Sequence, residues 1–101
     1  MFMEFSGFQW DRGNRDKSRL KHGVSAEETE QCFFNFNMVV GDDKHSTEQE
    51  MRYVLLGETD ARRKLFISFT MRSAFVRIIS ARPMHWKEEK VYEEEKRKNS
   101  I

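Results

Sequence analysis

Four arginines lie in or beside segments that have the composition of β-strands: Arg52, Arg72, Arg77 and Arg82. Arg77 stands in the middle of the apolar run Phe75–Ile79, whose aromatic and β-branched residues favour a strand. A charged side chain in such a strand is costly unless it reaches an anion or the edge of the sheet. A rigidly held guanidinium can form bidentate hydrogen bonds with phosphate. The arginines therefore predict a site for a phosphodiester backbone, and the alternative is that they pair with the chain's own carboxylates.

Proton transfer would need a further group, for which His45 is the candidate. It lies in a polar loop over residues 41–50 that also holds four carboxylates, and these would favour its protonated form. The alternative is an exposed loop histidine without a role. Lys21 and His22 end a predicted helix, where positive charge suits the helix dipole, and they could also contact flanking phosphates.

The sequence carries no other signature of an enzyme. It has no Gly-rich phosphate loop, no paired-cysteine metal site and no nucleophile elbow. The three histidines, His22, His45 and His85, are too scattered to predict a metal site. The single cysteine, Cys32, is followed by two phenylalanines, which predicts a buried thiol rather than a nucleophile. No metal and no cofactor are expected.

The length of 101 residues predicts a single domain over residues 1–101. No segment approaches the roughly 20 apolar residues of a membrane span. Residues 1–5 have neither the basic region nor the long apolar run of a signal peptide. Since the one cysteine cannot form an internal disulfide, we expect a cytoplasmic protein that does not contact a membrane.

The formal net charge is only +1, but the charges are unevenly distributed. Residues 12–22 carry five basic and one acidic side chain, residues 25–50 one basic and seven acidic, and residues 51–87 eight basic and two acidic. This pattern is typical of a polyanion-binding face beside a separate acidic face. The alternative is an ordinary surface on which the blocks mix.

Cap residues and periodicity predict the elements that would position these groups. Asp11 is placed to cap a helix over residues 12–22 that stops at Gly23, and Ser25 with Glu28 forms a capping box for the next helix. The first helix has Leu20 as its one clear apolar residue, so we expect it to be weakly docked or kept for its charges. The remaining elements are strands over 5–10, 37–40, 51–56, 65–70 and 72–82, the last of them central, and a helix over 84–97.

This order predicts an α+β fold. An N-terminal strand and two helices would pack on a mainly antiparallel sheet of about four to five strands, followed by a C-terminal helix.

Several segments of the chain resemble the BrnT family in their order and spacing. The resemblance covers roughly residues 8–93, and its parts are more specific together than alone. Asn14 and Ser18 depart from the lysine and asparagine usual in that family. The matching segments are Phe8–Asp11, Lys21–Ser25, His45-Ser46, Arg52 with Leu56-Gly57, Arg77–Arg82, and Glu88 with Tyr92.

BrnT proteins are the toxin half of a bacterial type II toxin–antitoxin pair and have a fold similar to the RelE ribonucleases. The resemblance therefore implies cleavage of RNA that arrests translation. It also implies neutralisation by a BrnA-like antitoxin. The resemblance implies contact with DNA only indirectly, through this antitoxin.

Cleavage of RNA without a metal needs activation of the 2′-hydroxyl, stabilisation of the phosphorane and protonation of the leaving 5′ oxygen. We assign the catalytic contacts with the phosphate to Arg72, Arg77 and Arg52, and proton transfer to His45. Lys21, His22 and Arg82 would bind the flanking RNA. The alternative function is a catalytically inactive BrnT-like module that binds a partner protein.

Overall fold

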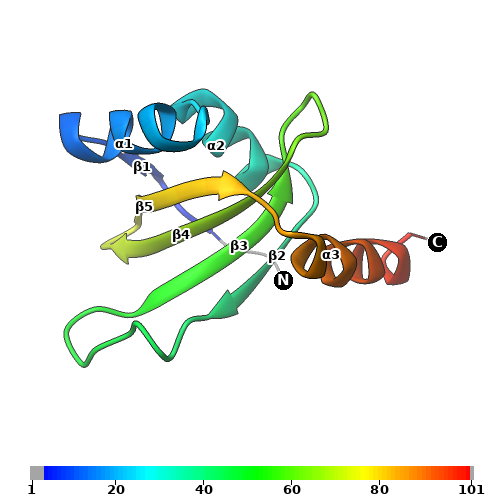
Figure 1. Cartoon of the computed structure of the whole chain (residues 1–101). Coiled ribbons are helices and arrows are strands. Elements are labelled where there is room, and N and C mark those ends of the chain that lie inside the picture. The colour runs from blue at the N-terminus through cyan, green and yellow to red at the C-terminus, as the bar shows by residue number, and fades with distance from the viewer. Residues whose placement is uncertain (1–3, 101) are drawn as a thin grey trace.

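The computed structural model of the chain describes residues 4–100. Within this range the chain forms one five-stranded sheet and three helices, which confirms the predicted α+β class (Figure 1). Met1–Met3, part of the opening segment expected to lack a signal peptide, lie outside the described residues. The elements are β1 (Gly7–Gln9), α1 (Arg12–His22), α2 (Ala26–Phe34), β2 (Asn37–Gly41), β3 (Arg52–Glu58), β4 (Lys64–Arg72), β5 (Phe75–Pro83) and α3 (Trp86–Lys98).

The sheet has the order β1-β5-β4-β3-β2. Strands β2 to β5 form an antiparallel meander, whereas β1 pairs in parallel with the start of β5. The strand predicted over 72–82 is β5, which is an interior strand, but β4 occupies the middle of the sheet. β5 begins later than predicted because Arg72 ends β4 and Ser73 makes the turn with a positive φ of 53°.

Helix α1 covers the part of β5 that β1 leaves unpaired. The pairing of β1 with β5 stops at Arg77, so the following residues of β5 have β4 on one side and no strand on the other. The side-chain amide of Asn14 donates to the carbonyl of Ile78 at 3.1 Å, and the amide of Ala81 donates to Ser18 Oγ at 2.8 Å. Buried backbone groups and sheet edges need such partners. The helix is thus docked through polar groups, while Leu20 is 76% exposed.

The helix caps confirm the predictions made from local sequence. Asp11 and Ser25 each accept a hydrogen bond from the backbone of the third helical residue, and Gly23 ends α1 in the left-handed conformation at φ 66°. A glycine takes this conformation at no steric cost.

The hydrophobic core lies between the sheet and the first two helices. It is formed by Val24, Cys32, Phe33, Leu55, Leu65, Ile67, Phe69, Val76, Ile78 and Ala81. Cys32 is fully buried as predicted, and burial raises the pKa of its thiol to about 12. A thiol with that pKa is not a nucleophile at neutral pH.

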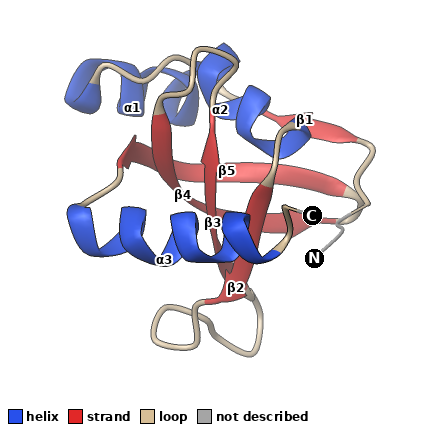
Figure 2. Cartoon of the chain, turned by 90° about the vertical axis from the view of Figure 1, so that its right-hand side faces the viewer, coloured by secondary structure: helices blue, strands red, loops and turns tan. Residues whose placement is uncertain are grey.

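Helix α3 lies apart from α1 and α2, across the end of the sheet where β3 and β5 finish (Figure 2). Its one buried residue is Tyr92, whose hydroxyl donates to Glu58 Oε1 at 2.9 Å and lies 3.2 Å from the carbonyl oxygen of Phe36. Lys96 forms an ion pair with the same glutamate, and Lys64 pairs with Glu93 at 2.9 Å. Polar contacts therefore hold this helix.

Among residues 4–100, no helix has the length and apolar character needed to cross a membrane.

Candidate functional site

Strand register places two of the predicted arginines in one row. Arg52 of β3 lies opposite Thr70 of β4, and Thr70 lies opposite Arg77 of β5. Residues paired in this way point to the same face of a sheet, as do residues two apart on one strand. Arg72, two residues after Thr70, therefore joins the same face.

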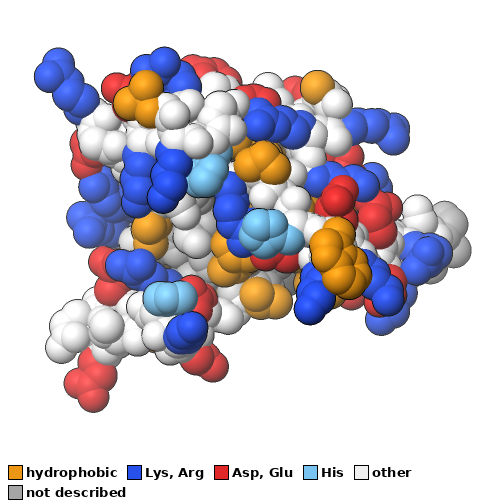
Figure 3. All heavy atoms as spheres, viewed as in Figure 1, with side chains coloured by type: hydrophobic (Ala, Val, Ile, Leu, Met, Phe, Trp, Pro, Cys, Tyr) orange, Lys and Arg blue, Asp and Glu red, His pale blue; other side chains and the backbone are white. Residues whose placement is uncertain are grey.

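Helix α1 closes this row into a hollow of about 270 Å³. In the space-filling view, Lys and Arg side chains gather beneath α1 at the left, where this hollow lies (Figure 3). We call it the arginine hollow. Four of its lining residues are cations from four different elements and one is a carboxylate, so it favours an anion. The lining residues are Gly13, Asn14, Lys17, Glu50, Arg52, Thr70, Arg72, Arg77, Ile78 and Ile79.

The guanidinium of Arg77 is held in place from β1 and from the cap of α1. It donates to Asp11 Oδ2 at 2.5 Å and to Gln9 Oε1 at 3.3 Å, and its side chain is 22% exposed. The hydrogen bond from Arg77 keeps the pKa of Asp11 below its usual value. Asp11 therefore has two roles, since it also caps α1 through the amide of Asn14 at 2.9 Å.

Glu50 lies between the other two arginines. Its carboxylate is 3.5 Å from Arg52 Nε and 3.6 Å from Arg72 Nη2. Both distances are longer than a good hydrogen bond between a guanidinium and a carboxylate, so the contacts are loose. An anionic ligand could take the place of this carboxylate without breaking a tight pair.

Comparison with known families then identifies the chain. A family model described as the ribonuclease toxin BrnT of type II toxin–antitoxin systems matches residues 10–88. The chain belongs to the BrnT family. No curated protein matches the sequence. The matched range includes every cation of the arginine hollow and ends in the first turn of α3, so the resemblance seen in the sequence is confirmed.

Four of the predicted site residues do not line the arginine hollow, and Arg82 and His45 are two of them. Arg82 forms a bidentate ion pair with Glu88, both distances being 2.9 Å, and its guanidinium lies 3.9 Å from the centre of the Phe66 ring. It thus connects β5 with α3. His45 lies in the loop before β3, where its Nδ1 is 2.8 Å from Asp42 Oδ2. Its side chain is 58% exposed.

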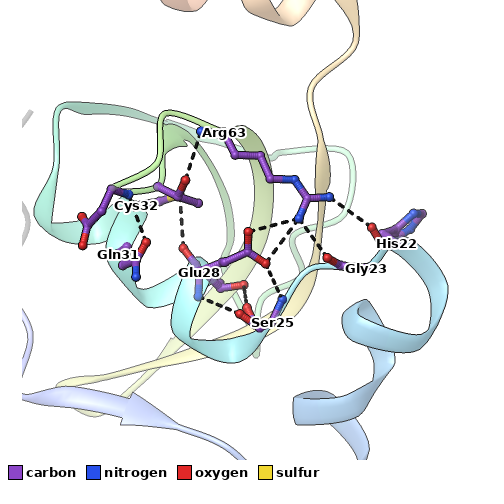
Figure 4. A network of polar contacts seen from close by, with 10 residues as sticks. His22, Gly23, Ser25, Glu28, Gln31, Cys32 and Arg63 are labelled. Atoms are coloured by element: carbon purple, nitrogen blue, oxygen red, sulfur yellow. Dashed lines mark hydrogen bonds and ion pairs between the residues drawn. The ribbon is translucent and has the colours of Figure 1, made fainter.

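The BrnT-like segment Lys21–Ser25 forms the corner between α1 and α2. Arg63 donates to the carbonyl oxygens of His22 at 3.3 Å and of Gly23 at 2.8 Å, and its Nη1 lies 3.1 Å from Glu28 Oε2 (Figure 4). The hydrogen bond from the Ser25 backbone, with the Arg63 guanidinium, keeps the pKa of Glu28 low against its desolvation. Lys21 and His22 do not line the hollow, and the residues of this segment contribute to the fold through backbone oxygens and a cap.

Sequence reasoning missed three polar residues that line the hollow: Lys17, Thr70 and Glu50. Lys17 follows Asn14 by one helical turn, a spacing that places both on one face of α1. Thr70 is 2% exposed and its hydroxyl donates to the carbonyl of Met51 at 2.7 Å. No group of three or more His, Cys, Asp or Glu side chains suited to a metal occurs among the described residues.

Proposed function

We propose that this BrnT-family chain cleaves RNA at the arginine hollow, by attack of the 2′-hydroxyl on the adjacent phosphate and without a metal. The observation that carries the proposal is the convergence of Arg52, Arg72 and Arg77 from three neighbouring strands on one hollow, with Lys17 beside them. Guanidinium groups can stabilise the charge that develops on the non-bridging oxygens.

In the proposed reaction, Arg72 and Arg77 hold the non-bridging oxygens and Arg52 positions the phosphate. Gln9 and Asp11 orient the Arg77 guanidinium before RNA arrives, which lowers the reorganisation needed at the moment of reaction. The 2′ oxygen bonds to phosphorus as its proton passes to Glu50 in the hollow or to His45 in the same loop, and the bond to the 5′ oxygen breaks. The 5′ oxygen leaves with a proton, for which the Lys17 ammonium is a donor in the hollow. The products are a 2′,3′-cyclic phosphate and a 5′-hydroxyl.

At the level of the cell, we propose that this cleavage arrests translation in the cytoplasm and that a BrnA-like antitoxin neutralises it. Membership in a type II toxin–antitoxin family supports an antitoxin partner. Induction of the chain alone in a bacterial host should then stop growth with decay of RNA. Co-expression of the neighbouring open reading frame should restore growth.

The direct test is cleavage of a labelled RNA by the purified chain, with and without a chelator. We expect Arg77→Ala to lower the rate by about 10²–10³-fold, as loss of a donor to a developing oxyanion does. Arg19→Ala is the matched control, since Arg19 lies on α1 outside the hollow and its ion pair is the exposed contact with Asp16. Circular dichroism must show both variants folded. Full activity in Arg77→Ala would remove this residue from the mechanism, and dependence on a divalent metal would contradict the reaction type.

The second candidate function is a BrnT-like binding module without catalysis. The observation that favours it is the pairing of all three arginines with Asp11 or Glu50. The same assay separates the two functions, because the module would bind RNA or an acidic segment and release no cleaved product.

A further inference from the structure

A second and larger hollow, of about 990 Å³, lies between the start of β1 and the end of α2. Four phenylalanines line it: Phe5 and Phe8 at β1, and Phe33 and Phe34 at the end of α2. We call it the aromatic groove. It shares no lining residue with the arginine hollow. Nothing in the proposed cleavage of RNA uses it.

The groove is already formed in the free chain. Phe5 packs edge-to-face on Phe8 at 5.2 Å between ring centres, and Phe8 packs on Phe33 in the same way, also at 5.2 Å. Phe34 lies 5.7 Å from Phe5, yet it is 72% exposed. An exposed aromatic ring beside a packed aromatic cluster is the typical anchor point of a protein interface.

The charges at the groove have one sign. Glu4 and Glu30 are among its lining residues, and no lining residue is basic. Glu30 Oε2 accepts a hydrogen bond from Trp10 Nε1 at 2.6 Å. Within residues 4–100, neither glutamate has a cation within 4.0 Å, whereas the arginine hollow has a carboxylate for each of its arginines. The groove therefore complements a partner that presents apolar side chains together with Lys or Arg, and it does not suit RNA.

We infer that the aromatic groove is the docking site of the antitoxin protein, through a segment with apolar anchors flanked by basic side chains. A type II family has a protein antitoxin, so a partner of this chemical class exists for the chain. The inference rests on family membership and does not depend on the chain cutting RNA. It places antitoxin recognition and the proposed chemistry on different surfaces, which β1 connects, because Gly7 lines the groove and Gln9 contacts Arg77.

The test uses the full chain and the protein encoded by the neighbouring open reading frame, with affinity measured by calorimetry in the absence of RNA. Phe34→Asp should weaken binding by at least about thirtyfold, as loss of an anchor residue does. Leu20→Asp is the matched control, because Leu20 is an equally exposed apolar residue on α1, outside the groove, and should bind as the unchanged chain does. Glu30→Lys supplies a second variant and should weaken binding through repulsion.

Wild-type affinity in folded Phe34→Asp would overturn the inference. Loss of binding in Arg77→Ala with full binding in Phe34→Asp would also overturn it and place the antitoxin on the arginine hollow. Self-association of the free chain that Phe34→Asp abolishes would assign the groove to a second copy instead. Loss of antitoxin binding in Phe34→Asp would support the inference even if the unchanged chain does not cut RNA, because antitoxin binding and RNA cleavage are measured independently.

Discussion

Each arginine of the hollow has a carboxylate partner, but the partners differ in how firmly they bind. Asp11 is fixed by its role as a helix cap and holds Arg77 at 2.5 Å. Glu50 touches Arg52 and Arg72 at 3.5 and 3.6 Å and is one-third exposed. Ion pairs of this length near solvent contribute little to stability. Asp11 therefore acts as a positioning group, whereas Glu50 is free to exchange its contacts for a ligand.

The position of Glu50 makes it a rival of His45 for the proton of the 2′-hydroxyl. We expect Glu50→Gln to lower the rate of RNA cleavage by about 10²–10⁴-fold, since the amide cannot accept a proton. His45→Ala should leave the rate nearly unchanged, because the side chain lies in an exposed loop and contacts Asp42. The cleavage rates of the two folded variants check this prediction. The reverse pattern would support His45, the residue assigned from the sequence.

Residue types predicted which arginines form the candidate site, but their grouping depended on register. The arginines, with Arg77 inside an apolar strand, were predicted to bind phosphate from composition alone. That Thr70 stands between Arg52 and Arg77 follows from the pairing of β3, β4 and β5, which includes a shift between Ser68 and Phe69. Such a shift moves side chains between faces and has no local sequence signal here.

At the scale of elements, local signals predicted the helices well and tertiary pairing was harder. Asp11, Gly23 and Ser25 each act through neighbouring backbone groups, so their roles were visible in the sequence. The attachment of α1 to β5 joins Ser18 to Ala81, which no local pattern reveals. Asn14 and Ser18 are the groups that make this attachment.

Helix α3 is the element whose attachment depends most on charge. Burial alone would raise the pKa of Glu58, but hydrogen bonds from Lys96 and Tyr92 outweigh it, so the pKa lies below the ordinary 4.5. Glu88 behaves in the same way. Burial alone would raise its pKa, but the hydrogen bond from Arg82 helps to outweigh burial, so the pKa of Glu88 also lies below the ordinary value. A carboxyl group with a lowered pKa in the folded state stabilises that state above its ordinary pKa. The stabilisation is lost as the pH falls through the folded-state value.

We therefore expect α3 to detach in acid before the sheet unfolds. As the pH falls below the ordinary carboxyl pKa of 4.5 and through the lower folded-state values of Glu58 and Glu88, amide protons of α3 should lose protection from hydrogen exchange while those of β4 keep theirs. Glu58→Gln should show weak protection already at neutral pH, because Lys96 and Tyr92 lose their charged partner. Glu94→Gln is the control, since Glu94 is exposed and forms no ion pair among the described residues. Equal loss of protection in α3 and β4 would show that the helix does not act as a separate unit.

For the whole molecule, the uneven charge seen along the sequence becomes two distinct surfaces. Basic residues from the 12–22 and 51–87 blocks meet in the arginine hollow, while glutamates at positions 4 and 30 stand at the aromatic groove. The blocks also mix, because Glu50 of the 25–50 block lines the hollow and Arg63 of the 51–87 block pairs with Glu28. The proposed binding of RNA does not require a high net charge, because the local field of a cationic hollow, rather than the net charge, acts on a phosphate at contact distance.

The salt dependence of RNA binding measures how many cations contact phosphate. Each phosphate neutralised on a single strand contributes about −0.7 to the slope of log affinity against log salt concentration, so the four cations of the hollow predict about −3. Arg72→Ala should make the slope less steep by about 0.7, whereas Arg97→Ala, an exposed cation on α3, should leave it unchanged. The measurement is titration with a 2′-O-methyl oligonucleotide, which binds but lacks the attacking hydroxyl. An equal change of the slope in both variants would mean that RNA is attracted by diffuse charge and not held at the hollow. The reason is that Arg72 and Arg97 carry the same formal charge, so only a localised contact with phosphate can make their effects on the slope differ.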